Sequence, residues 1–167
     1  MAEFLWIFWS FSLLGWGLER LFAAVTRSPQ RRRRCLLLLP LCPVYGLGMA
    51  AVLALPPSLR SGWPLYLWGG LTATSVEYIY HWWGETFLSV SFWDYTGVFG
   101  NLRGRVCLPF SLAWGALALG LVYGVDPVVR PLLEGVPALV TGWAAATVGT
   151  DLVLSAALLR RTGDRAC

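Results

Sequence analysis

Long apolar stretches recur along the chain, separated by shorter polar connections. Each stretch has about 20 residues, the length of α-helix that crosses the hydrocarbon core of a bilayer. We therefore predict an all-α fold, a bundle of five transmembrane helices that forms one integral membrane domain over residues 1–167. The predicted spans cover residues 4–24, 36–55, 63–88, 107–125 and 135–159.

The amino-acid composition is that of a membrane protein and argues against a soluble domain or a nucleic-acid-binding protein. Apolar residues make up 57% of the chain and charged residues only 13%, which is more apolar than an ordinary soluble domain. The net charge of +4 comes from arginines at the ends of apolar stretches, so we expect no nucleic-acid partner. The four cysteines show neither CxxC nor Cys/His metal spacing, so we expect free thiols, no metal and no cofactor.

The placement of arginines predicts the orientation of the spans. Arginines follow the first and fifth stretches and precede the fourth, and an odd number of spans puts these groups on one side. Basic residues in short loops mark the cytoplasmic side. We therefore predict a multi-pass protein of the cytoplasmic membrane with its N-terminus outside and its C-terminus inside. The groups are Arg27 with Arg31 to Arg34, Arg103 with Arg105, and Arg160 with Arg161 and Arg165.

The second stretch carries residues that interrupt helices. Pro40 and Pro43, followed by Gly46 and Gly48, should break or kink a helix over residues 36–55. Backbone carbonyls freed in this way are tolerated at membrane depth only where they face protein or a water-filled cavity. We therefore expect this segment to line a cavity.

Three acidic residues fall inside predicted spans, where charge is costly and usually faces the bundle interior. Counted from the outer end of each span at about 1.5 Å per residue, Glu19, Glu77 and Asp151 all lie in the inner third of the bilayer. They form one polar layer if their helix faces converge. Gly15 lies one turn before Glu19, so the first helix is thin directly above its acid. Alternatively, Glu19 pairs with Arg20 and Asp151 caps a neighbouring helix.

The third span has a polar face. Glu77, His81 and Glu85 recur at every fourth residue, so they lie on one side of the helix. This stripe is typical of a water-lined face or a proton path. A metal site is the weaker interpretation, because this spacing spreads the ligands over about 12 Å of a single helix.

The connection over residues 89–106 is too long for a simple turn between helices and too apolar to extend into water. We expect it to fold onto the bilayer surface or back into the bundle, with Asp94 paired to Arg103 or Arg105. As a lid, it would close the cytoplasmic end of a polar cavity, with Arg105 facing Glu77 or Glu19. The alternative is an interfacial loop that rests on lipid.

Six short motifs occur in a fixed order: LGWGLE (14–19), LPLCPVYGLG (39–48), SVEY (75–78), FWDY (92–95), NLRGRVCL (101–108) and SLAWG (111–115). Together they resemble the bacterial membrane protein family called putative ABC-transporter type IV, or CmpB-like, over residues 10–125. The chain departs from the family pattern at RRRRCLLLL, where an Asn-Arg-Gly-Phe entry is usual, and its last span carries no matching motif. The matching positions are Gly15, Trp16, Glu19, Pro43, Tyr45, Gly46, Glu77, Tyr78, Trp93, Asp94, Tyr95, Asn101, Gly104 and Arg105.

Residues and resemblance together favour a small permease-like protein that transports or binds a small cation or cationic solute near the cytoplasmic side. The expected substrate-binding residues are Glu19, Glu77, Tyr45, Tyr78, Trp16 and His81. The expected gate or loop residues are Trp93, Asp94, Tyr95, Asn101, Arg103 and Arg105. Two alternatives stay open: an intramembrane enzyme that modifies lipid or isoprenoid substrates, and a tryptophan-rich sensor that binds porphyrin or another hydrophobic ligand.

The expected partners follow from what the chain lacks. Every basic residue is an arginine, so the chain has no Walker A motif, which requires a lysine. The resemblance therefore implies a membrane subunit whose ATPase, if any, is another chain. Five spans are few for a monomeric carrier, so we expect a homodimer or a partner membrane subunit in the lipid bilayer.

Overall fold

The computed structural model describes residues 2–26 and 38–162, and these residues fold into helices without a β-strand. The all-α prediction is confirmed. The elements are α1 (Ala2–Thr26), α2 (Pro43–Leu53), a 3₁₀ turn (Pro57–Leu59), α3 (Gly62–Pro64), α4 (Gly70–Trp83), α5 (Leu108–Gly120), α6 (Asp126–Leu133) and α7 (Ala138–Thr162). Turns of π-helix at Leu65–Gly69, Gly84–Leu88 and Leu121–Val125 continue their neighbours into longer rods.

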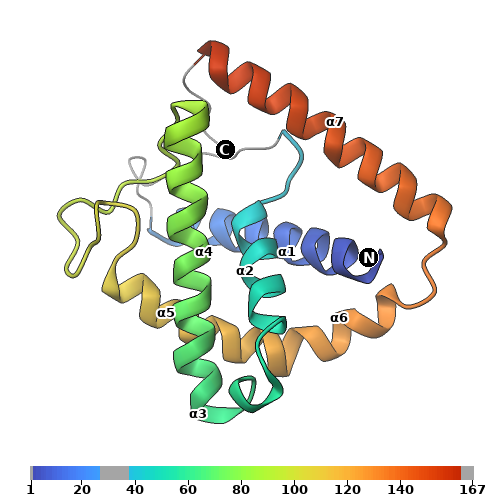
Figure 1. The fold of residues 1–167 in the computed structure, drawn as a ribbon, viewed down its shortest axis with the longest axis horizontal. Coiled ribbons are helices and arrows are strands. Elements are labelled where there is room, and N and C mark those ends of the chain that lie inside the picture. The colour runs from blue at the N-terminus through green and yellow to red at the C-terminus, as the bar shows by residue number, and fades with distance from the viewer. Residues whose placement is uncertain (1, 27–37, 163–167) are drawn as a thin grey trace.

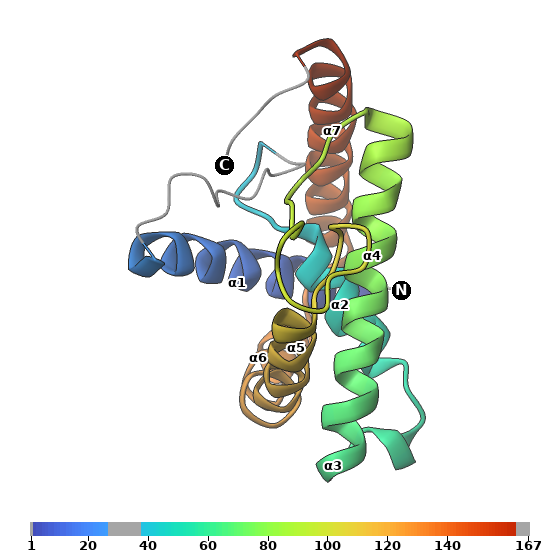
Figure 2. The same ribbon diagram turned by 90° about the vertical axis from the view of Figure 1, so that its left-hand side faces the viewer.

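The helices are arranged around α2, which packs against both α1 and α4 (Figure 1). Helix α4 also packs against α5. Helix α7 lies at the edge of the molecule. Helix α1 runs across α4 instead of alongside it in both views (Figures 1 and 2).

Helix α2 is shorter than the predicted span over residues 36–55. Residues 38–42 are not helical, and the helix begins at Pro43, while residues 36 and 37 lie outside the described part of the chain. Proline lacks a backbone N–H and has a fixed φ, so it suits the first position of a helix and resists an interior one. At about 1.5 Å per residue, the 11 residues of α2 are too short to cross a bilayer core.

The predicted fourth span is longer than expected. The rod that begins at Leu108 continues past residue 125 through a π-helical turn into α6 and ends at Leu133. The wider π turn ends at Val125, two residues before Pro127, whose ring would clash with the preceding turn of a regular helix. Proline therefore deforms this helix without ending it.

Two helices, Leu108–Leu133 and Ala138–Arg161, are long and apolar enough to cross a membrane by length and composition. The topology of five spans and its orientation stay predictions. Part of the basic pattern behind that orientation, namely Arg27, Arg31 to Arg34 and Arg165, lies outside the described residues.

Candidate functional site

Glu19 and Tyr45 meet where α1 lacks a side chain. A Cβ atom at Gly15 would overlap the ring of Tyr45, so only glycine lets α2 place this ring against α1. The Tyr45 hydroxyl then donates a hydrogen bond of 2.6 Å to Oε1 of Glu19, one turn further along α1. The expectation that α1 is thin directly above its acid is confirmed.

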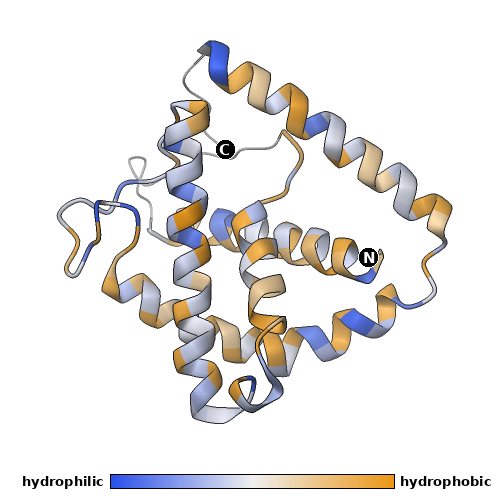
Figure 3. Cartoon of the chain, viewed as in Figure 1, coloured by the Kyte–Doolittle hydropathy of each residue, from blue (hydrophilic) through white to orange (hydrophobic). Residues whose placement is uncertain are grey.

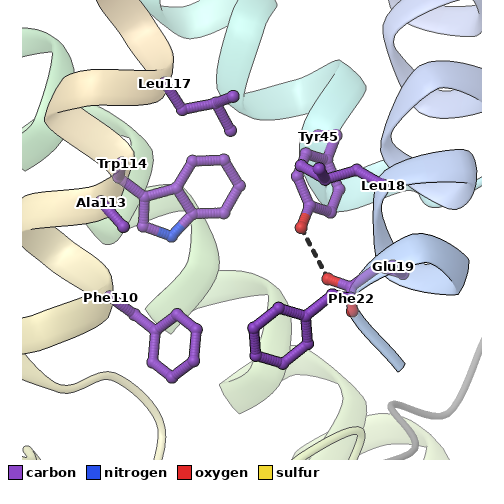
Figure 4. Close-up of a pocket in the computed structure, with 8 residues that line it drawn as sticks. All are labelled: Leu18, Glu19, Phe22, Tyr45, Phe110, Ala113, Trp114 and Leu117. Carbon is purple, nitrogen blue, oxygen red and sulfur yellow. Dashed lines mark hydrogen bonds between the residues drawn. The ribbon is translucent and has the colours of Figure 1, made fainter. Parts of the chain in front are cut away.

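A pocket of about 230 Å³ lies between α1 and α5, with α2 behind it (Figure 4). Helix α1 contributes one wall and α5 the facing wall, and the only side chain from α2 is that of Tyr45. The lining residues are Leu18, Glu19, Phe22, Tyr45, Phe110, Ala113, Trp114 and Leu117. Glu19 is the only one of them with a charged side chain.

Four aromatic side chains contribute to the apolar lining of the pocket around that carboxylate. The Tyr45 and Trp114 rings lie 5.0 Å apart at an angle of 50°. The Phe22 and Phe110 rings face each other edge to face with centroids 6.2 Å apart, and they close one end of the pocket (Figure 4). A single carboxylate among four rings is suited to a ligand that combines positive charge with apolar surface.

Glu77 lies behind the pocket and does not line it. Its side chain is fully buried, at 0% exposure, on α4. The indole N–H of Trp114 donates to Oε2 over 2.8 Å, and the Tyr95 hydroxyl donates to Oε1 over 3.1 Å. A buried carboxylate requires such donors, because burial without hydrogen bonds is costly. Glu77 therefore fixes the ring that forms the pocket wall.

The aromatic loop, residues 89–106, docks along the polar stripe of the rod formed by α4 and the following π turn. Tyr95 binds Glu77, and the hydroxyl of Ser91 lies 3.2 Å from Nε2 of His81. Further along, Nε of Arg105 donates to Oε2 of Glu85 over 2.8 Å. Each polar residue of the stripe thus has a polar contact with a side chain of the loop. The expectation that the loop folds back into the bundle is confirmed.

Arg105 has other partners than expected. Besides Glu85, its Nη1 donates to the Tyr78 hydroxyl over 2.8 Å, and its guanidinium lies 5.1 Å from the centre of that ring. The hydrogen bond to Glu85 raises the pKa of Arg105. The predicted contact of Arg105 with Glu77 or Glu19 is wrong. Glu85 lies two turns beyond Glu77 along the rod, beside the end of the loop that carries Arg105, whereas Tyr95 of the loop meets Glu77.

Asp94 does not pair with an arginine, so that prediction is also wrong. Its Oδ1 accepts the backbone N–H of Thr96 over 2.7 Å, and the side-chain and backbone hydrogen bonds from Thr96 lower the pKa of Asp94. Short acidic side chains satisfy nearby backbone groups in turns in this way. The carboxylate therefore shapes the loop and remains exposed to solvent.

The remaining loop residues stabilise its fold. The indole N–H of Trp93 donates to the backbone carbonyl of Arg105 over 2.7 Å and joins the two ends of the loop. Asn101 accepts the N–H of Gly104 over 3.2 Å and donates to the carbonyl of Val98 over 3.0 Å. Arg103 is exposed and has a left-handed backbone with φ of 54°.

Three predicted site residues lie away from the pocket. Trp16 has the guanidinium of Arg20 over its ring at 5.3 Å, and His81 and Tyr78 lie beneath the aromatic loop.

Asp151 does not complete a layer with the other acids. Its carboxylate accepts the backbone N–H groups of Leu38 and Leu39 over 3.2 and 3.1 Å, which ties α7 to the segment before α2. The predicted layer of three acids is therefore wrong for Asp151, and the cap-like alternative describes it better.

Sequence reasoning missed the contribution of α5. Trp114 and Phe110 are four residues apart, so they lie on one face of that helix, and Trp114 belongs to the SLAWG motif. The spacing was a usable signal, but apolar residues occur on every face of a membrane helix. Among residues 2–26 and 38–162, no three His, Cys, Asp or Glu side chains are placed to hold a metal ion.

The family model described as "Putative ABC-transporter type IV" matches residues 6–156. The chain belongs to this family. The match includes every residue of the pocket, the buried glutamate and the aromatic loop, and it extends the earlier resemblance to residue 156 in α7. No curated protein and no solved structure matches the chain.

Proposed function

We propose that the chain is a multi-pass membrane component of a transport system, and that it binds a small cationic solute beside Glu19. The family description, an ABC-transporter type, supports a transport role. The solute would occupy the pocket between α1 and α5, and the aromatic loop would control its cytoplasmic side.

The distribution of polarity supports membrane embedding. Leu139, Trp143 and Val153 on α7 are each about 70% exposed (74%, 70% and 68%), whereas Thr141, Asp151 and Ser155 of the same helix are buried. Apolar residues run along α7 at the edge of the molecule (Figure 3). Water would penalise such large exposed apolar surfaces, and lipid would not. The same arrangement holds on α1, where Leu14, Leu18 and Leu21 are exposed.

One observation carries the solute proposal: the Glu19 carboxylate lies at the wall of a pocket that is otherwise built from rings and aliphatic side chains. The bond from Tyr45 is one of the contacts of Glu19 and orients its carboxylate at the pocket wall. In an apolar pocket the attraction between opposite charges is much stronger than in water. A cationic group is therefore the ligand chemistry that this carboxylate favours.

Glu77 connects the pocket to the aromatic loop. Because its two oxygens bind Trp114 and Tyr95, a displacement of the pocket wall alters the bond that holds the loop. Arg105, Glu85 and Tyr78 fasten the loop at its other end. We assign Glu77 a positioning role and the aromatic loop the role of a gate.

The energy source would come from another chain. The 167 residues contain no lysine and therefore no Walker A motif, so the proposal assigns nucleotide hydrolysis to a separate ATPase. A second copy or a partner membrane subunit would supply the remaining walls of a translocation path.

Native mass spectrometry of the detergent-purified protein tests the proposal. Wild type should retain a small cationic molecule, and Glu19→Gln should lose it because the variant removes the charge and keeps the shape. Glu134→Gln is the matched control, since Glu134 is exposed at the end of α6, and it should retain the molecule. Retention in Glu19→Gln equal to wild type would refute the role of Glu19.

A further inference from the structure

The pocket beside Glu19 selects among cations by its shape and its surface. We infer that its ligand is a small organic ammonium ion with an apolar or aromatic group, which enters sideways from the bilayer between α1 and α5. This inference rests on the proposed function and specifies its substrate class.

The lining argues against a bare metal ion or a strongly hydrated cation. Glu19 offers one carboxylate and Tyr45 one hydroxyl, while the other six lining side chains carry no oxygen ligand. An inorganic cation such as Mg²⁺ or Ca²⁺ requires about six oxygen ligands or retained waters. An alkylated ammonium is weakly hydrated and needs only one counter-charge and surrounding ring faces.

The rings are placed for such a group. Tyr45 donates to Glu19 through its hydroxyl, and the Trp114 ring lies 5.0 Å from the Tyr45 ring, so both rings line the pocket that holds the carboxylate. Phe22 is one turn from Glu19 on α1 and faces Phe110 across the pocket (Figure 4). The volume of about 230 Å³ is below the range of roughly 300–1,000 Å³ found for drug-sized ligands. The ligand is therefore small.

The surroundings of the pocket indicate the route of entry. Leu18 and Phe22 line the pocket and are also exposed at the surface, at 40% and 38%. Leu14 and Leu21, each about one turn from Leu18 on α1, are exposed as well. A rim of apolar side chains suits an opening into lipid and would be unfavourable in water.

Calorimetric titration of the protein in nanodiscs tests the ligand class. The probe is benzyltrimethylammonium, compared with its neutral isostere neopentylbenzene and with tetramethylammonium. Benzyltrimethylammonium should bind at least tenfold more tightly than either, and Glu19→Gln should weaken it about tenfold. Phe22→Leu and Phe110→Leu should each weaken it about threefold by removing a π face while the pocket stays apolar.

The outcomes separate the two proposals. Equal binding of neopentylbenzene would overturn the inference, because the pocket would then be a site for neutral apolar molecules. Tighter Glu19-dependent binding of tetramethylammonium would also overturn it, yet would leave the proposed cation binding intact. If no cation binds and Glu19→Gln behaves as wild type, both proposals fail.

A longer chain on the probe tests the route. Benzyldimethylhexylammonium should bind as well as benzyltrimethylammonium, because an opening toward lipid lets the hexyl chain leave the pocket. A loss of binding by tenfold or more would refute lateral entry. Leu18→Trp, which adds bulk at the rim, should slow association and should leave the effect of Glu19→Gln unchanged.

Discussion

Tyr95→Phe removes one hydroxyl group from the contact between the aromatic loop and Glu77. The ring should stay in place, because it stacks on Phe110 with centroids 5.0 Å apart. The lost group donates over 3.1 Å to a carboxylate with 0% exposure, so bulk water cannot replace the donor while the loop is docked. Hydrogen bonds to charged groups contribute about 1.5–3 kcal/mol. The docked loop should be destabilised by that amount.

Hydrogen exchange of the loop amides measures this change. The backbone N–H groups of Tyr95 and Leu102 are bonded within the loop, to Gly104 and Val106, and are therefore protected only while the loop is folded. A loss of about 1.5–3 kcal/mol predicts exchange that is roughly ten to a hundred times faster, since each 1.4 kcal/mol is a factor of ten. Exchange in α7 should not change.

Two further variants sharpen the test. Tyr123→Phe removes a hydroxyl that accepts the N–H of Gly62 at the π turn after α5, away from the aromatic loop, and it should leave loop exchange unchanged. In a Glu77→Gln background the effect of Tyr95→Phe should shrink toward the roughly 0.5–1.5 kcal/mol of a neutral hydrogen bond. Loop exchange within about twofold of wild type in Tyr95→Phe would refute the role of Glu77 in holding the loop.

Two other predictions concern α1 and the loop turn. Gly15→Ala should displace Tyr45 and destabilise the protein by about 1–3 kcal/mol through overpacking. Gly17→Ala is the control, because a Cβ atom at Gly17 meets nothing within 4 Å, and it should be neutral or slightly stabilising. Thermal unfolding in detergent measures both, and equal unfolding midpoints for the two variants would contradict the account of Gly15. The Thr96 hydrogen bonds lower the pKa of Asp94 in the folded loop, so their stabilisation is present above the unfolded pKa and is lost as pH falls through the lower folded value. Hydrogen exchange of the loop amides in wild type, corrected for its intrinsic pH dependence, should therefore show added opening of the loop below about pH 4. Asp94→Asn should remove that pH-dependent component. An identical pH profile in the variant would contradict the role of Asp94 in the loop turn.

The helices were predictable because long apolar runs have few other solutions. The same holds for the polar stripe Glu77, His81 and Glu85, whose spacing fixes a common helix face whatever the neighbours are. Gly15 and Glu19 were informative for a similar reason. A residue without a side chain one turn above an acid leaves space that a neighbouring helix can fill, and Tyr45 does so.

The partners of these residues were not predictable from local pattern. Arg105 could reach several acids in sequence terms, and only the docked position of the loop selects Glu85. Trp114 escaped attention because an apolar helix offers many aromatic positions, and its indole N–H reveals a role only once Glu77 lies opposite. The crossing of α1 over α4 depends on packing between distant segments, for which the sequence carries no periodic signal (Figures 1 and 2).

The two hydrogen bonds of Glu77 have a thermodynamic consequence. If a ligand that shifts Trp114 weakens the docking of the loop by some factor, then anything that undocks the loop must change ligand affinity by the same factor, because coupling free energies are reciprocal. A protein that binds the aromatic loop would thus act on a pocket that it never touches. If the proposed transport system draws on an ATPase that binds this loop, the buried carboxylate of Glu77 would let the ATPase and the ligand each sense the state of the other.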